Sequence, residues 1–86
     1  MSRQKTALVT GGARGIGLAI SETLARDGYH VLVNYFRSEE EAKYLLARLR
    51  ETGCAATLLR ADVANPRDVR EMVAAALLET GRIDVL

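Results

Sequence analysis

Glycines are concentrated where a short apolar run gives way to a helical pattern, in the segment VTGGARGIG from Val9 to Gly17. Phosphate groups bind well to the N–H groups at the start of a helix, where donors are unpaired and the helix dipole is positive. We expect Gly11 to permit a sharp turn, Gly15 to let the backbone approach a phosphate, and Gly17 to let the helix pack closely on the strand. The spacing therefore predicts a binding site for the pyrophosphate of a dinucleotide.

Glycine spacing alone is a weak signal, because any tight turn from a strand into a helix can collect glycines. The nearest competing motif is the phosphate-binding loop of mononucleotide-dependent enzymes, which the separation of Gly12 and Gly17 would fit. Leu18 and Ala19 stand where that loop carries its lysine and its serine or threonine. No side chain could then reach a γ-phosphate or a magnesium ion, so kinase, ATPase and GTPase functions are excluded.

Three short apolar runs have the pattern of strands that are buried on both faces: Thr6–Thr10, His30–Tyr35 and Ala56–Ala61. Residues between these runs repeat with helical spacing, which indicates one helix after each strand. Strands that alternate with helices predict right-handed crossovers and a parallel sheet with helices on its faces. The sequence therefore predicts an α/β fold, half of a doubly wound sheet in the order β-α-β-α-β-α, with a fourth strand beginning at Ile83–Leu86.

Residues at the expected helix ends support these boundaries. Ser38 can cap the second helix, with Glu41 at its third position, and Asn65 precedes Pro66, which suits a first helical turn. A glycine follows each helical stretch, where a left-handed residue is least costly as glycine: Gly28, Gly53 and Gly81.

The length, charge and cysteine content of the chain exclude several classes of function. The chain has 86 residues, 49% of them apolar, and a formal net charge of +1, which predicts one domain over residues 1–86 and no attraction to nucleic acid or anionic lipid. No apolar run could span a bilayer or act as a secretion signal. Cys54 is the single cysteine, so neither an internal disulfide nor a cysteine metal cluster is expected. We expect a cytoplasmic protein without a metal site.

The pattern Thr10-Gly11-x-x-x-Gly15-x-Gly17 resembles the TGxxxGxG signature of the short-chain dehydrogenases/reductases, and the resemblance spans the whole chain. Asp62-Val63 resembles the dipeptide that contacts adenine in that family, and residues 81–86 look like the run that leads into its NNAG motif. The resemblance implies a Rossmann-type fold and a dinucleotide cofactor. Within the family, the glycine turn together with Val33-Asn34-Tyr35 is most similar to the 3-oxoacyl-[acyl-carrier-protein] reductases of fatty-acid synthesis.

The end of the second strand indicates which dinucleotide is bound. Dinucleotide folds that bind NAD(H) carry an acidic residue there, which bonds the ribose 2′-hydroxyl and repels a 2′-phosphate. No acid lies between Val31 and Ser38, and Arg14 and Arg37 can meet a phosphate with charge-assisted contacts. We therefore expect NADP(H) rather than NAD(H), although both arginines could instead be solvated surface residues. The expected cofactor-binding residues are Gly11, Arg14, Gly15, Ile16, Gly17, Asn34, Tyr35, Arg37, Asp62 and Val63.

Catalysis in this family uses a tyrosine, a lysine four residues after it, and a serine. Here the residues four after each tyrosine are Val33, Glu39 and Arg48. Tyr44 and Arg48 are expected to form a surface pair, and His30 to be structural or solvated rather than a general base. The chain thus carries no predicted catalytic residue and is expected to be inactive by itself.

The resemblance implies that a longer parent enzyme, forming homo-oligomers, reduces the carbonyl of a 3-oxoacyl thioester with NADPH. One alternative is an enoyl-thioester reductase of the same family. The other is a dinucleotide-binding module without catalysis.

Overall fold

The structure is a computed structural model that describes residues 4–84. Its elements follow the order β1 (Thr6–Val9), α1 (Gly15–Arg26), β2 (His30–Tyr35), α2 (Glu39–Glu51), β3 (Ala56–Arg60) and α3 (Pro66–Thr80). The predicted alternation is confirmed. β1 and β3 each end one residue earlier than predicted, because Thr10 already belongs to the turn and Ala61 follows the last paired residue of β3.

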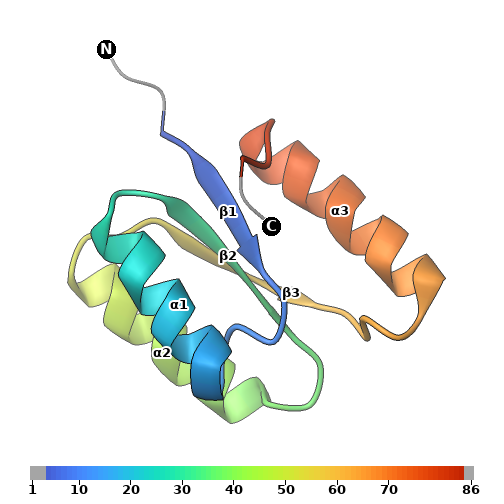
Figure 1. The fold of residues 1–86 in the computed structure, drawn as a ribbon, viewed down its shortest axis with the longest axis horizontal. Helices are drawn as coiled ribbons and strands as arrows, with labels where there is room; N and C mark the ends of the chain where they lie inside the picture. Colours follow the sequence, from blue (N-terminus) through green and yellow to red (C-terminus); the bar gives the residue numbers. More distant parts are fainter. Residues whose placement is uncertain (1–3, 85–86) are drawn as a thin grey trace.

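The strands form one parallel sheet with β2 between β1 and β3. α1 and α2 cover one face of this sheet and α3 covers the other (Figure 1). Val31 and Val33 of β2 pack toward Leu45 of α2, and Leu32 between them packs with Met72 of α3. The predicted α/β, Rossmann-type sheet with helices on both faces is therefore confirmed, and β2 is buried on both sides.

Most of the helix ends lie where the sequence predicted them. The Asn65 carboxamide oxygen accepts hydrogen bonds from the N–H groups of Arg67 and Asp68 at 2.9 and 3.3 Å, so the predicted cap of α3 is confirmed. The three glycines expected after the helices all have a positive φ: Gly28 (93°), Gly53 (80°) and Gly81 (78°).

Ser38 stands at the cap position of α2, as predicted, but the expected side-chain cap is wrong. Ser38 precedes α2 with φ −95° and ψ 50°, which is not the extended conformation of a capping residue, and its side chain makes no capping hydrogen bond. Its hydroxyl instead accepts a hydrogen bond from Arg14 Nη1 at 3.5 Å. The acidic first turn, Glu39–Glu41, supplies the negative charge that stabilises this helix end.

The predicted fourth strand lies partly outside the described residues, which end before Val85 and Leu86. Where the chain is described, it runs beside β1 but is not yet a strand. The Asp84 N–H donates to the Thr6 carbonyl at 2.8 Å, and the Thr6 N–H donates to Asp84 Oδ2 at 2.8 Å. A hydrogen bond from Arg82 lowers the pKa of Asp84 below its ordinary value. β1 thus has a neighbour on the side away from β2 at this one point.

A single buried side chain, Asn34 near the end of β2, joins the sheet to the turn after β1. It is 2% exposed. Its backbone carbonyl accepts a hydrogen bond from Gly12 N–H at 3.0 Å, and its Oδ1 accepts one from Gly11 N–H at 3.1 Å. Its Nδ2 donates to the carbonyls of Leu59 and Ala61 at 3.2 and 3.1 Å. One carboxamide therefore fixes the glycine turn and the end of β3 relative to each other.

The opposite end of β2 carries His30, whose Nε2 lies 2.9 Å from Thr57 Oγ1. Thr57 in turn donates to Glu79 of α3 at 3.3 Å. Partial burial lowers the pKa of His30 below its ordinary value, and the negative charge of Glu79 offsets part of that shift. The expectation that His30 is structural agrees with these contacts, which lie at the sheet edge away from the glycine turn.

No helix in the part of the chain from residue 4 to residue 84 is long and apolar enough to cross a membrane.

The substitution Asn34→Leu keeps a similar side-chain volume but leaves Gly11 N–H and the carbonyls of Leu59 and Ala61 without this partner. We expect the free energy of unfolding to fall by about 1–3 kcal/mol for each buried group that stays unpaired. Urea unfolding measures this loss, and hydrogen exchange at Gly11 measures the release of the turn. Asn65→Ala is the matched control, because loss of a helix cap costs about 1 kcal/mol but should leave the exchange of Gly11 unchanged. Equal exchange rates at Gly11 in all three proteins would contradict the role of Asn34.

His30 is expected to make stability depend on pH. Because its pKa is lowered in the folded state, the unfolded chain binds the proton more readily at pH values just below about 6.5. The stability that neutral His30 contributes to the fold is fully present above about pH 6.5 and is lost as the pH falls through the lowered pKa of the folded state. Between about pH 7.5 and about pH 5.5, wild type should lose more free energy of unfolding than His30→Gln. Urea unfolding at both pH values tests this, and parallel losses in the two proteins would refute it.

Candidate functional site

The glycine turn lies at the carboxyl end of β1 and leads directly into α1, at the sheet edge where ligands bind in open parallel sheets. Gly11 and Gly15 have φ values of 61° and 53°, a region that side chains other than glycine rarely adopt. The strand-to-helix turn expected from the sequence is therefore present. It places the N-terminus of α1 at this edge.

Gly17 is required by a close contact. A Cβ atom added there would lie 2.1 Å from the carbonyl oxygen of Gly11. The sequence led us to expect close packing of the helix on the strand, and the contact is instead with the backbone of the turn itself. Any side chain at this position would push α1 away from the turn.

Gly12 is a second position where the backbone leaves no room for a side chain, a role that the sequence analysis did not identify. Its added Cβ would lie 2.8 Å from Ser21 Oγ and 3.0 Å from the Val9 carbonyl oxygen. Ser21 is fully buried in α1 and donates to the Gly12 carbonyl at 3.0 Å. No spacing rule singles out this pair, because Ser21 lies two helical turns into α1. The serine thus closes the turn onto the helix.

The N–H groups of the turn fall into two sets. Those of Gly11 and Gly12 bond to Asn34. Those of residues 13–17 make no hydrogen bond of good geometry among residues 4–84, as expected for the start of a helix. The first turn of α1 also contains no acidic residue, and Ile16 is 81% exposed. N–H groups without a well-placed acceptor at the positive end of a helix dipole can bind an anion.

Arginines gather around the connection between β2 and α2. Arg14 reaches Ser38 from the glycine turn and lies 3.9 Å from Glu41 of α2, an exposed and weak ion pair. Arg37 lies within the connection, with its guanidinium carbon 5.5 Å from the centroid of the Phe36 ring. Arg37 thus belongs to this connection, and Arg14 contacts it at Ser38.

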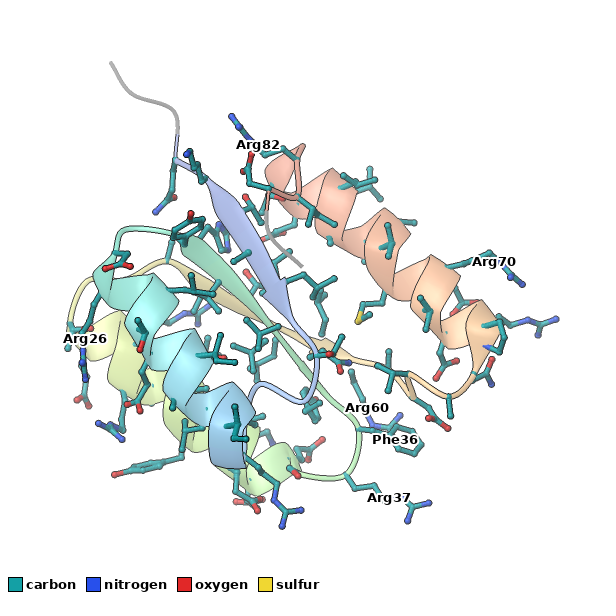
Figure 2. All side chains as sticks on the ribbon, in the orientation of Figure 1. Arg26, Phe36, Arg37, Arg60, Arg70 and Arg82 are labelled. Carbon is teal, nitrogen blue, oxygen red and sulfur yellow. The ribbon has the colours of Figure 1, made fainter. Side chains whose placement is uncertain are left out.

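Arg60 was not identified from the sequence. It is the last residue of β3, and its guanidinium carbon lies 4.9 Å from the Phe36 ring centroid (Figure 2). The parallel register pairs it with Tyr35, the residue directly before Phe36. Tyr35 itself is half-buried and packs against the core beneath α1 and α2. Only the register between strands could have located Arg60, since about twenty-five residues separate it from this connection.

Asp62 and Val63 follow β3 at the same edge. The Asp62 N–H donates to Asp68 Oδ2 at 3.0 Å, and Asp62 Oδ1 accepts a hydrogen bond from the Ala64 N–H at 2.9 Å. These contacts hold the dipeptide, and Asp68 is a second residue that sequence analysis missed. Val63 is 54% exposed and offers an apolar surface suited to a flat ring. A carboxylate beside an exposed apolar side chain can receive a ring that carries an amino group.

Tyr44 and Arg48, which have the spacing of the family's catalytic tyrosine and lysine, lie on α2 and not at the glycine turn. Tyr44 is exposed on α2, and its ring faces Arg48, whose guanidinium carbon is 5.8 Å from the ring centroid. Arg48 also forms an ion pair with Glu22 of α1 at 3.2 Å. Both contacts are between helix side chains, so the expected surface pair is confirmed.

Comparison with known families finds a match over almost the whole chain. The model of the family described as short chain dehydrogenase matches residues 5–86. Among curated relatives, a short-chain dehydrogenase/reductase homolog of Bacillus subtilis, YusS, is 43% identical over 82 residues, which are 95% of this chain and 75% of that protein. The 3-oxoacyl-[acyl-carrier-protein] reductase FabG of Staphylococcus epidermidis is 39% identical over 82 residues, 95% of this chain and 34% of that protein. The chain thus spans about a third of the length of the reductases it matches.

Solved structures share the fold over almost the whole chain. A blue fluorescent protein from a metagenomic library, in complex with NADPH, has a TM-score of 0.90 at 37% identity, covering 96% of this chain and 35% of that one. A short chain dehydrogenase of Burkholderia cenocepacia in complex with NADP has a TM-score of 0.90 at 40% identity, covering 96% of this chain and 34% of that one. With the glycine turn at the carboxyl edge of a parallel sheet and a family match from residue 5 to residue 86, the chain belongs to the short-chain dehydrogenase/reductase family.

Proposed function

We propose that this chain binds NADP(H) at the carboxyl edge of its sheet, as the cofactor-binding part of a carbonyl reductase. The observation that carries the proposal is the start of α1, where the N–H groups of residues 15–17 make no hydrogen bond of good geometry among residues 4–84, with arginines nearby and no acidic residue in the first turn. Two similar structures, solved with NADPH and with NADP, support it.

The residues of the site divide by the part of the dinucleotide they would hold. The N–H groups of Gly15, Ile16 and Gly17 would bind the pyrophosphate, because they are the unpaired donors at the helix start. Asp62 and Val63 would hold the adenine. We keep Gly11, Asn34 and Tyr35 among the predicted site residues, but as groups that shape it, since Asn34 is buried and bonded to the turn.

The choice of NADP(H) over NAD(H) rests on charge. β2 ends without an acidic residue, Arg37 belongs to the connection that follows it, and Arg14 contacts Ser38 of the same connection. A 2′-phosphate brings two negative charges and several acceptor oxygens, which match guanidinium donors. The Arg14–Glu41 ion pair is exposed and long, so a phosphate could take the place of Glu41 at little cost.

NADPH, when bound, supplies the hydride that reduces a carbonyl. The residues of this chain would bind and orient the adenosine and pyrophosphate half of the cofactor. The similarity to proteins named 3-oxoacyl-[acyl-carrier-protein] reductase supports a 3-oxoacyl thioester as the substrate of a longer enzyme. An enoyl-thioester reductase of the same family remains the alternative reaction. We also propose that these 86 residues alone bind the cofactor without turnover, since no tyrosine here is followed by a lysine four residues later.

Calorimetric titration with NADPH and with NADH tests the binding proposal. We expect wild type to bind NADPH at least about tenfold more tightly, the equivalent of one charge-assisted hydrogen bond. Gly17→Ala should abolish binding of both, because its Cβ would lie 2.1 Å from the Gly11 carbonyl oxygen and force the turn to move. Gly53→Ala is the matched control: it strains a positive φ at the opposite edge of the sheet and should leave both affinities unchanged. Equal affinities for NADPH and NADH in wild type would count against the cofactor preference.

A turnover assay tests the separation of binding from chemistry. The 86-residue chain is mixed with NADPH and a 3-oxoacyl thioester, and the absorbance of the reduced nicotinamide is recorded over time. We expect no oxidation of NADPH above the rate without protein. A full-length relative of the same family serves as the positive control. Protein-dependent oxidation by the 86-residue chain would overturn the proposal that it lacks the catalytic groups.

A further inference from the structure

Two guanidinium groups from different elements contact one aromatic ring at the carboxyl edge of the sheet. The guanidinium carbon of Arg37 lies 5.5 Å from the Phe36 ring centroid, and that of Arg60 lies 4.9 Å from it. Figure 2 shows the three side chains together, beyond the ends of β2 and β3. Arg37 comes from the connection after β2, whereas Arg60 is the last residue of β3.

This pair of cations has no counter-ion among residues 4–84. Neither Arg37 nor Arg60 has a carboxylate oxygen within the 4.0 Å of an ion pair. Arg60 shares a hollow between β3 and α3 with Asp68 and Glu71, but Asp68 already accepts the hydrogen bond from the Asp62 N–H. Two like charges on one ring repel each other unless an anion lies between or beside them. The arrangement therefore favours a bound anion.

The Phe36 ring also restricts the two arginines. A guanidinium that stacks on an aromatic face keeps its N–H donors at the edge of the plane, free to meet an acceptor. Fewer side-chain conformations are then lost when the ligand binds. Arg14 reaches the same connection through Ser38, so guanidinium groups from three separate segments surround residues 36–38.

We propose that Arg60 is a specificity-determining residue that acts with Arg37 on the 2′-phosphate of NADP(H). This inference rests on the proposed function and extends it to a residue that lies outside the glycine turn and outside the connection after β2. The ligand chemistry is a phosphate monoester on a ribose, because this group brings the double negative charge that two unneutralised guanidiniums require. NAD(H) has a hydroxyl at that position and would gain nothing from Arg60.

The test compares Arg60→Gln with wild type in calorimetric titrations with NADPH and NADH. We expect the Kd for NADPH to rise about tenfold, as for loss of one charge-assisted contact, and the Kd for NADH to stay unchanged. Arg37→Gln is the reference variant and should behave in the same way. Arg70→Gln is the matched control, since Arg70 is an exposed arginine on α3, away from Phe36 (Figure 2). Arg60→Lys, which keeps the charge but loses the planar fork, should recover part of the affinity.

The outcomes separate this inference from the proposed function. An unchanged Kd for NADPH in Arg60→Gln, with a raised Kd in Arg37→Gln, overturns the role of Arg60 alone. Equal weakening of NADPH and NADH in Arg60→Gln also overturns it, because the arginine would then act only by supporting the fold through Phe36. If wild type binds neither dinucleotide, the proposed function fails and the role of Arg60 fails with it.

Discussion

The site depends on the buried carboxamide of Asn34. Its oxygen accepts a hydrogen bond from the Gly11 N–H and its amino group bonds the end of β3, while the backbone carbonyl of Asn34 accepts the bond from the Gly12 N–H. A buried polar group is stable only when its hydrogen bonds are satisfied, so these contacts fix the turn in one position. The N–H groups at the start of α1, residues 15–17, make no hydrogen bond of good geometry within residues 4–84. Asn34, through its side chain and its backbone, thus holds the first half of the turn, and the half that follows can bind an anion.

Close approach of backbone to backbone is the second constraint on this edge. Gly17 lies against the Gly11 carbonyl, and Gly12 lies against Ser21 and Val9. Because no side chain fits at either position, the first turn of α1 sits directly on the turn that precedes it. The positive end of the helix dipole is therefore brought to the carboxyl edge of the sheet, where Arg14 and Arg37 add formal charge. Backbone geometry and side-chain charge favour the same kind of ligand.

Much of this could be predicted from the sequence because the signals are local. The strand runs, the cap at Asn65 and the glycines after each helix depend on neighbouring residues, and the structure agrees with them. Arg60 and the bonds of Asn34 depend on the register between strands that are about 25 residues apart. The prediction of a side-chain cap at Ser38 was wrong because Ser38 has a non-extended backbone and its hydroxyl accepts a hydrogen bond from Arg14 of the glycine turn. Local patterns locate elements, but contacts between elements decide which polar side chains remain available.

The charges around this edge of the sheet are local and of both signs. The formal net charge of +1 gives no long-range attraction for an anion. Glu39 and Glu41 even place negative charge at the start of α2, beside the connection that carries Arg37. Lys43 and Arg14 lie near these two carboxylates, whereas Arg37 and Arg60 have none within ion-pair distance in the described part of the chain. Selectivity for a phosphorylated ribose would then come from a few local cations that no carboxylate neutralises, and raising the salt concentration should weaken NADPH binding more than NADH binding.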